Sequence, residues 1–139
     1  MICLDASVVG MLISPDEDSD KILPLYEKHR LAGENFIAPS LLPYEVASLL
    51  RKKQLRKLLT NAEILGALHF FERLNISLIE IDDMLERCLG LCQIFGEALT
   101  VYDASYLVAA EKHKAILWTA DKALFEMVSI SFSNLQLIH

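Results

Sequence analysis

Four acidic residues stand at positions where a side chain could take part in chemistry. Asp5 directly follows a short apolar run, and Asp121 follows another near the end of the chain. Glu45 and Asp103 lie near the start of segments with an apolar helical pattern. An acid beside an apolar face is costly to bury unless it is paired or metal-bound. Carboxylates gathered in one place repel one another, and hard divalent cations such as Mg²⁺ or Mn²⁺ prefer their oxygen atoms.

Each of these acids also has an ordinary structural explanation. Aspartate is a favoured helix N-cap, which would account for Asp5 and Asp121. Asp103 near the start of a helix would favour the helix dipole, and Glu45 could simply point to solvent. The four residues are informative as a set, because the elements around them place all four near one edge of the expected fold.

Short apolar runs and helical patterns alternate along the whole chain. The apolar runs predict strands at residues 1–4, 36–38, 76–81, 116–119 and 135–138. The helical patterns predict helices at residues 8–13, 19 or 20 to 31, 41–53, 60–74, 83–95, 102–112 and 121–127. Capping-box patterns begin two of these helices, and a glycine follows two of them; the residues are Thr60 with Glu63, Asp83 with Glu86, Gly33 and Gly96.

This alternation predicts an α/β domain with a mostly parallel sheet covered by helices. In such a sheet the ligand crevice lies outside the carboxyl ends of the strands. The 139 residues fit a single domain over 1–139, and the sparse proline and glycine leave no linker to divide it.

Composition narrows the class of protein further. Hydrophobic residues make up 53% of the chain, so some apolar surface is expected to be buried against a partner, as in a homodimer. The net charge of -6 argues against a simple nucleic-acid-coating module but leaves a carboxylate-based nuclease open. Three cysteines give no disulfide framework, which favours a reducing, cytoplasmic setting. The first residues lack the basic and apolar regions of a signal peptide, so we expect none there, and no apolar run suits a membrane span.

Four ordered segments together resemble a known family, the PIN-domain ribonucleases. They are LDAS at residues 4–7, PSLLPYEV at 39–46, YDASYLVAA at 102–110 and WTADKALF at 118–125. Each segment carries one of the four acids, and together they span nearly the whole chain. In size and pattern the chain is most similar to the VapC-type toxins of prokaryotic toxin–antitoxin pairs.

The resemblance implies a Rossmann-like PIN fold and Mg²⁺- or Mn²⁺-dependent cleavage of RNA, leaving 5′-phosphate and 3′-hydroxyl ends. It also implies frequent dimers and an antitoxin protein whose tail covers the site. Carried over residue by residue, the metal-binding and catalytic acids would be Asp5, Glu45, Asp103 and Asp121. Ser7 and Thr119 would be supporting hydroxyl residues at the same site.

RNA contact requires positive charge, and one cluster follows Glu45. Arg51, Lys52, Lys53, Arg56 and Lys57 supply five of the 13 basic residues. They form either an RNA-backbone patch or a solvated helix end, where cations favour the helix dipole. Aromatic residues for base stacking are not clustered with them.

Other functions remain as alternatives. One is a PIN-fold RNA-processing nuclease without a toxin role, and another is a catalytically silent RNA- or protein-binding module. A phosphate-handling enzyme of the haloacid dehalogenase type needs a second aspartate where Ser7 stands. A receiver domain needs an adjacent acidic pair that the chain lacks near its first strand. No glycine-rich phosphate loop and no paired-histidine zinc motif occur.

Overall fold

Five parallel strands form the centre of the computed structural model, which describes residues 1–139. The strands are β1 (Ile2–Leu4), β2 (Phe36–Pro39), β3 (Ser77–Ile79), β4 (Ile116–Thr119) and β5 (Leu135–Leu137). Their order across the sheet is β3-β2-β1-β4-β5, and every pair is parallel. The sequence-based prediction of a mostly parallel α/β sheet is therefore confirmed.

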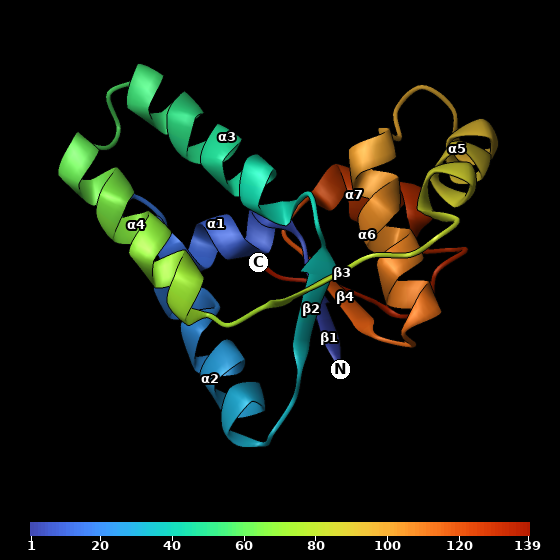
Figure 1. Ribbon diagram of the computed structural model, residues 1–139, viewed down its shortest axis with the longest axis horizontal. Helices are drawn as coiled ribbons and strands as arrows, with labels where there is room; N and C mark the ends of the chain where they lie inside the picture. The colour runs from blue at the N-terminus through green and yellow to red at the C-terminus, as the bar shows by residue number, and fades with distance from the viewer.

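Seven α-helices surround this sheet. They are α1 (Ala6–Ile13), α2 (Leu23–Leu31), α3 (Leu42–Leu55), α4 (Asn61–Arg73), α5 (Met84–Phe95), α6 (Val101–Lys112) and α7 (Lys122–Val128). Figure 1 shows α1 to α4 on one side of the sheet and α5 with α6 on the other. Strand order reverses at β1, which lies between β2 and β4, so the end of β1 is the switch point where ligands bind in open α/β sheets.

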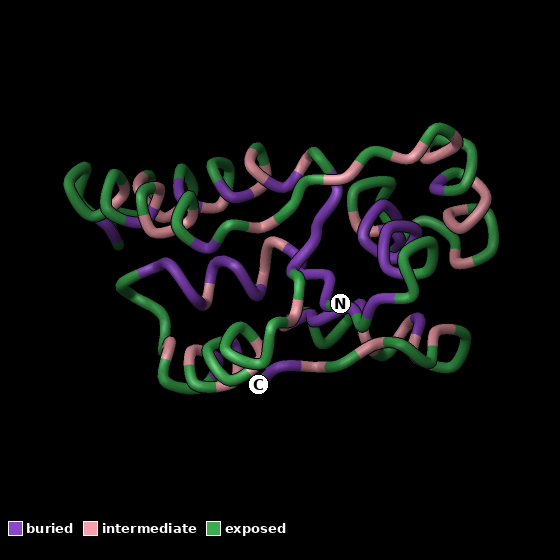
Figure 2. The backbone as a smooth tube through the Cα atoms, turned by 60° about the horizontal axis from the view of Figure 1, so that its bottom comes forward, coloured by how far each residue is buried: buried purple, intermediate pink, exposed green.

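The core lies along the central strands and the helices that touch them. All three residues of β1 and all four of β2 are buried. Helix α6 is buried from Ala104 to Ala110, because it packs against the sheet on one side and α5 on the other. Figure 2 shows this buried centre and the exposed outer helices. No helix combines the length and apolar character that crossing a bilayer requires.

Three details differ from the sequence-based predictions. Strand β3 is shorter than residues 76–81, because it is an edge strand with an exposed face. The helix expected from residue 19 or 20 is divided into a 3₁₀ turn (Ser19–Lys21) and α2, which has Pro24 in its first turn. The capping box at Thr60 is present, but the one at Asp83 is not, since Asp83 instead pairs with Arg87 at 2.7 Å.

Helices α1 and α3 approach each other closely at Gly10. A Cβ atom added to Gly10 would lie 2.9 Å from Cδ1 of Leu49 on α3. The absence of a side chain at this position lets α3 lie directly over α1. The first turn of α3 carries Glu45, so the packing of α1 against α3 contributes to the position of one of the four acids.

Candidate active site

The ends of β1 and β4 bring two aspartates to the same edge of the sheet. Asp5 is the N-cap of α1 and accepts a hydrogen bond from the Val8 N–H at 3.0 Å. Asp121 caps α7 in the same way, through the Leu124 N–H at 3.0 Å. Because β1 and β4 are parallel neighbours, these two caps follow adjacent strand ends. The capping role suggested by the sequence is real, and it fixes both carboxylates at the carboxyl edge.

Two hydroxyl side chains join these strand ends. Ser7 Oγ donates to Asp5 Oδ1 at 2.5 Å and accepts from the Ala120 N–H at 2.9 Å. Thr119 is fully buried, and its Oγ1 accepts from the Asp121 N–H at 3.0 Å. Ser7 and Thr119 therefore hold the turns that carry both aspartates.

Glu45 lies in the first turn of α3, directly beyond the end of β2. Its Oε1 atom is buried and has no hydrogen-bond partner. Burial raises the pKa of Glu45, and the nearby Tyr106 hydroxyl only partly opposes that rise. The buried Tyr106 hydroxyl itself also lacks a hydrogen bond of normal geometry. A buried carboxylate oxygen without a partner carries a desolvation cost, which a bound cation would offset.

Asp103 lies in the first turn of α6, where its N–H donates to Thr100 Oγ1 at 3.1 Å. Its charge links the other acids into one electrostatic group. Burial is the largest cause of the raised pKa values of Asp5, Glu45 and Asp103. In addition to burial, the charge of Asp103 raises the pKa of Asp5 and of Glu45, and the charge of Asp121 raises the pKa of Asp103. The four acids thus come from four different elements to the same end of the molecule, the upper end of the sheet in Figure 1.

Burial is the main cause of the altered acidity in this group. Desolvation raises the pKa of Asp5 to about 6, while the Ser7 and Thr119 hydroxyls and the Val8 N–H act in the lowering direction. Desolvation also raises the pKa values of Glu45 and Asp103. Each of these three carboxyl groups therefore resists ionisation and would gain from a nearby cation.

The side chains are not, however, arranged as a preformed coordination site. No three acidic, histidine or cysteine side chains form a group that could hold one metal ion. The oxygen-only donor set and the unpartnered Glu45 Oε1 fit the chemistry of a hard divalent cation. Holding such an ion would require the carboxylates to rotate toward it.

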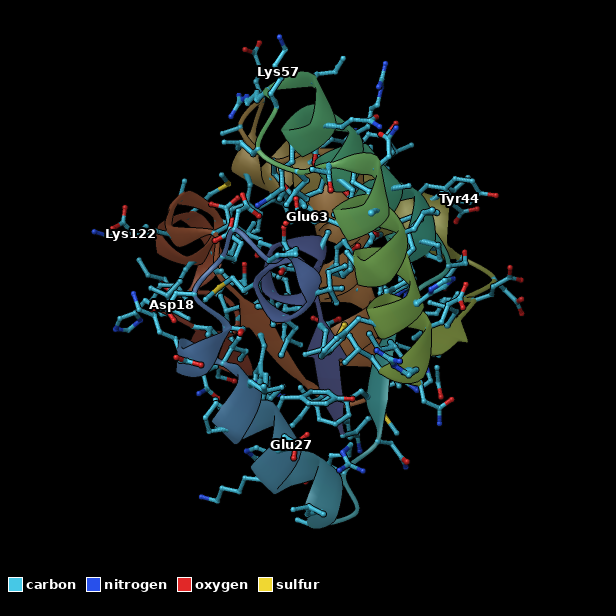
Figure 3. All side chains as sticks on the ribbon, turned by 90° about the vertical axis from the view of Figure 1, so that its left-hand side faces the viewer. Asp18, Glu27, Tyr44, Lys57, Glu63 and Lys122 are labelled. Atoms are coloured by element: carbon cyan, nitrogen blue, oxygen red, sulfur yellow. The ribbon has the colours of Figure 1, made fainter.

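The five basic residues that follow Glu45 differ in their surroundings: only two of them line a hollow beside Glu45. Lys53 contacts Asp16 Oδ1 at 2.9 Å and Glu17 Oε1 at 2.8 Å, both in the loop after α1. Arg51 donates to Gln54, and Lys57 lies beyond the far end of α3 (Figure 3). Lys52 and Arg56 instead line a hollow of about 700 Å³ together with Glu45. We call this the α3–α6 hollow, since α3 and its two ends supply most of the lining and Tyr102 at the start of α6 adds to it.

Sequence reasoning missed three tyrosines at this edge. Tyr44 and Tyr102 line the α3–α6 hollow, and Tyr106 lies behind Glu45. The available signal was local, because Tyr44 directly precedes Glu45 and Tyr102 directly precedes Asp103. Tyr106 follows Asp103 by three residues, which places the two side chains on one face of α6.

The parallel α/β fold and the four acids at the carboxyl end of its sheet together indicate the class of protein. The family model of the PIN domain matches residues 2–129, and the chain belongs to that family. The resemblance inferred from the four sequence segments is therefore confirmed.

Individual relatives agree with this assignment. The chain is 31% identical over 129 residues to a protein named Ribonuclease VapC3 from Pyrobaculum aerophilum, and the match covers 90% of this chain and 92% of that protein. The crystal structure of PAE2754 from the same organism superposes with a TM-score of 0.62 at 23% identity, covering 91% of this chain and 84% of that one. The structure of FitAcB from Neisseria gonorrhoeae gives 0.60 at 16% identity, covering 100% and 97%. The two structural matches are likenesses of fold.

Proposed function

We propose that this protein is a ribonuclease that cleaves RNA phosphodiester bonds with the help of carboxylate-held Mg²⁺ or Mn²⁺. The observation that carries the proposal is the electrostatic coupling of Asp5, Glu45 and Asp121 to Asp103 at one edge of the sheet. The similarity to a protein named as a ribonuclease supports RNA as the substrate.

The proposed roles follow from the position of each side chain. Asp5, Glu45, Asp103 and Asp121 would hold the divalent ions. Such ions supply a counter-charge for the phosphate and activate water for attack. Ser7 and Thr119 keep the two strand-end aspartates in place through their hydrogen bonds. Lys52 and Arg56 would bind backbone phosphates beside the cleaved bond, offsetting the acidic charge of the protein.

We further propose that the protein is the toxin of a toxin–antitoxin pair, acting in the cytoplasm. Its similarity to a VapC-named protein supports an antitoxin partner that covers the acidic edge. Exposed apolar side chains support protein partners, including a second copy in a homodimer. On α5 these are Leu85, Leu89 and Ile94, which are 70%, 56% and 74% exposed.

One observation favours a different function within the same family. Since no three side chains are arranged to hold an ion, a catalytically silent RNA- or protein-binding PIN domain is the second candidate. An RNA-processing nuclease without a toxin role uses the same site, and differs only in its cellular context.

A cleavage assay separates these candidates. Purified protein is incubated with a mixed-sequence RNA in MgCl₂, in MnCl₂ and in EDTA. We expect cleavage with either metal, none in EDTA, and none for Asp5→Asn or Asp103→Asn. Asp20→Asn is the matched control, because Asp20 is exposed and lies in the 3₁₀ turn away from the edge. Cleavage at the native rate by Asp5→Asn or Asp103→Asn, or in EDTA, would refute the proposed mechanism.

The toxin role needs a separate experiment in cells. Induced expression of the wild-type chain is expected to arrest growth, and Asp5→Asn is expected to remove that effect at equal protein level. Co-expression of the product of the adjacent gene should restore growth if that product is the antitoxin. Normal growth with active ribonuclease in the cell would assign the chain to RNA processing instead.

A further inference from the structure

We propose that Tyr106 is a positioning residue for the metal ions, whose hydroxyl holds one oxygen of the Glu45 carboxylate and leaves the other oxygen for a cation. This inference rests on the proposed ribonuclease function and gives a role to a residue that is not one of the four acids. Tyr106 acts entirely through Glu45 and touches neither the cation nor the RNA.

The hydroxyl of Tyr106 makes no contribution to the core that would explain it. Tyr106 is 1% exposed, and its hydroxyl is buried without a hydrogen bond of normal geometry. The other buried tyrosine, Tyr26, is 3% exposed and donates to the Leu74 carbonyl at 2.9 Å. A buried hydroxyl without a partner costs stability, and phenylalanine would fill the same space without that cost. The oxygen of Tyr106 therefore calls for an explanation outside the packing of the core.

The group nearest to this hydroxyl in its effects is the carboxyl group of Glu45, whose Oε1 atom is also buried without a partner. Burial is the main cause that raises the pKa of Glu45, and the Tyr106 hydroxyl acts in the lowering direction, as a donor to a carboxylate does. Burial first, and then the charge of Glu45 and a hydrogen bond to it, raise the pKa of Tyr106. The two atoms that lack partners are thus a donor and an acceptor beside each other. Rotation of either side chain would join them.

Tyr106 is held more firmly in the core than Glu45. It lies in the part of α6 that is buried from Ala104 to Ala110, and its carbonyl accepts a hydrogen bond from Cys3 Sγ on β1 at 3.9 Å. Glu45 is only partly buried and lines the α3–α6 hollow. Helices α3 and α6 lie on opposite sides of the sheet (Figure 1), so this contact joins the two layers. A fixed donor on α6 can therefore set the direction of a carboxylate on α3.

A donor behind Glu45 is what a metal-binding carboxylate needs. Carboxylates that bind metal ions are themselves hydrogen-bonded by outer residues, which fix their orientation. No other side chain donates a hydrogen bond to Glu45, and Lys52 acts on it only through its charge. Without the Tyr106 hydroxyl, Glu45 would have to be ordered by the cation alone, and that ordering would reduce the affinity for the cation.

Binding of Mn²⁺ in the absence of RNA tests this inference, measured by the electron paramagnetic resonance signal of the free ion. Tyr106→Phe removes one oxygen and keeps the ring, and we expect it to weaken Mn²⁺ binding about tenfold. Its stability in urea should be unchanged or higher, because a buried hydroxyl without a partner is removed. Tyr26→Phe is the matched control: it should lower stability, because the bond to Leu74 is lost, and leave Mn²⁺ binding unchanged.

A double-mutant cycle shows whether Tyr106 acts through Glu45. In a Glu45→Ala background, Tyr106→Phe is expected to have no further effect on Mn²⁺ binding. In an Asp121→Asn background it should weaken binding by the same factor as in the wild type, because Asp121 is held by its own cap on α7. Cleavage of RNA by Tyr106→Phe should be slow at low Mn²⁺ and return to the wild-type rate at saturating Mn²⁺, which a damaged fold would not allow.

The outcomes distinguish this inference from the proposed catalysis. Wild-type affinity of Tyr106→Phe for Mn²⁺ would overturn the inference, as would an equal loss of affinity in Tyr26→Phe or an undiminished effect in the Glu45→Ala background. If the wild type cleaves RNA while one of those results holds, the proposed ribonuclease function stands alone. If the expected tyrosine pattern appears but no metal supports cleavage, the positioning role stands and the catalysis fails. A wild type that binds no Mn²⁺ would refute both.

Discussion

At the scale of the residue, Asp5 combines a structural role with an electrostatic cost. It caps α1, yet it is only 5% exposed and its pKa is raised to about 6, mainly by burial. In the unfolded chain Asp5 has the ordinary pKa of 3.8. Between about pH 4 and pH 6, Asp5 therefore holds its proton more often in the folded protein than in the unfolded chain. Stability therefore falls as pH rises from about 4 to 6. The difference between the folded and unfolded pKa values corresponds to about 3 kcal/mol of destabilisation at neutral pH.

Removing this charge should stabilise the metal-free protein. We expect Asp5→Asn to raise the free energy of unfolding in EDTA at pH 7 by up to about 3 kcal/mol, because the amide keeps a cap acceptor without the buried charge. The gain should shrink to near zero at about pH 4, where Asp5 in the folded wild type is protonated. Urea denaturation across this pH range measures it, with Asp20→Asn as the control. A gain independent of pH would contradict the explanation.

The four acids could be selected as candidates from the sequence, but their contacts could not be predicted. Asp5 and Asp121 were recognisable because each follows a buried apolar run within a few residues. The Ser7 bridge to Ala120 joins positions 113 residues apart, so no local pattern indicates it. Tyr44 and Tyr102 were missed because a single exposed aromatic residue leaves no periodic signal.

At the scale of the element, α3 places neighbouring lysines in different environments. Lys53 is tied to the loop after α1, with its side chain 12% exposed, whereas Lys52 faces the α3–α6 hollow. Residues adjacent in a helix point about 100° apart, so the two lysines meet different partners. A basic run in the sequence therefore predicts positive charge but not which charges remain free.

This difference predicts that replacing lysine by glutamine affects different properties at the two positions: stability at Lys53 and RNA binding at Lys52. Lys53→Gln should lower the free energy of unfolding by about 1–2 kcal/mol, because two carboxylates lose their partner, and should leave the salt dependence of RNA binding unchanged. Lys52→Gln should leave stability unchanged and reduce that salt dependence. Denaturation and anisotropy on both variants check this. Equal effects of the two substitutions on both quantities would refute the division.

The contact of α1 with α3 at Gly10 gives a prediction about an element's position. Gly10→Val should cost about 1–3 kcal/mol of stability, because the new side chain meets Leu49. It should also lower kcat by shifting Glu45 with α3. Gly66→Val is the control, since nothing lies within 4 Å of a Cβ at Gly66 in α4. The free energy of unfolding and kcat are measured for both variants. If Gly66→Val lost as much stability and kcat as Gly10→Val, the packing explanation would be wrong.

Element boundaries were predicted well where local signals agreed with packing. The Thr60–Glu63 box and Gly96 both mark helix ends in the structure. The pattern at Asp83 failed because a nearby arginine competes for the same carboxylate. Strand β3 was predicted too long because exposure at a sheet edge is a tertiary property.

At the scale of the whole molecule, the fold brings four mutually repelling carboxylates to one end of the sheet. The acids follow β1, β2 and β4 or begin α6, so they come from the central strand, its two neighbours and a helix on the opposite face. Their mutual repulsion is part of the folded state alone, because the unfolded chain separates them. Folding and cation binding are therefore linked: an ion that binds only the folded protein must stabilise it.

This linkage predicts a metal-dependent stability of the entire molecule. Mn²⁺ or Mg²⁺ at about 100 times its dissociation constant should add about 2.7 kcal/mol to the free energy of unfolding and raise Tm. Asp103→Asn should show the largest loss of this gain, because Asp103 is coupled to each of the other acids. Scanning calorimetry measures the shift, with NaCl at equal ionic strength as the control for screening. If NaCl and MnCl₂ raised Tm equally, or if Mn²⁺ raised the Tm of Asp103→Asn as much as that of the wild type, the four acids would not bind a common ion.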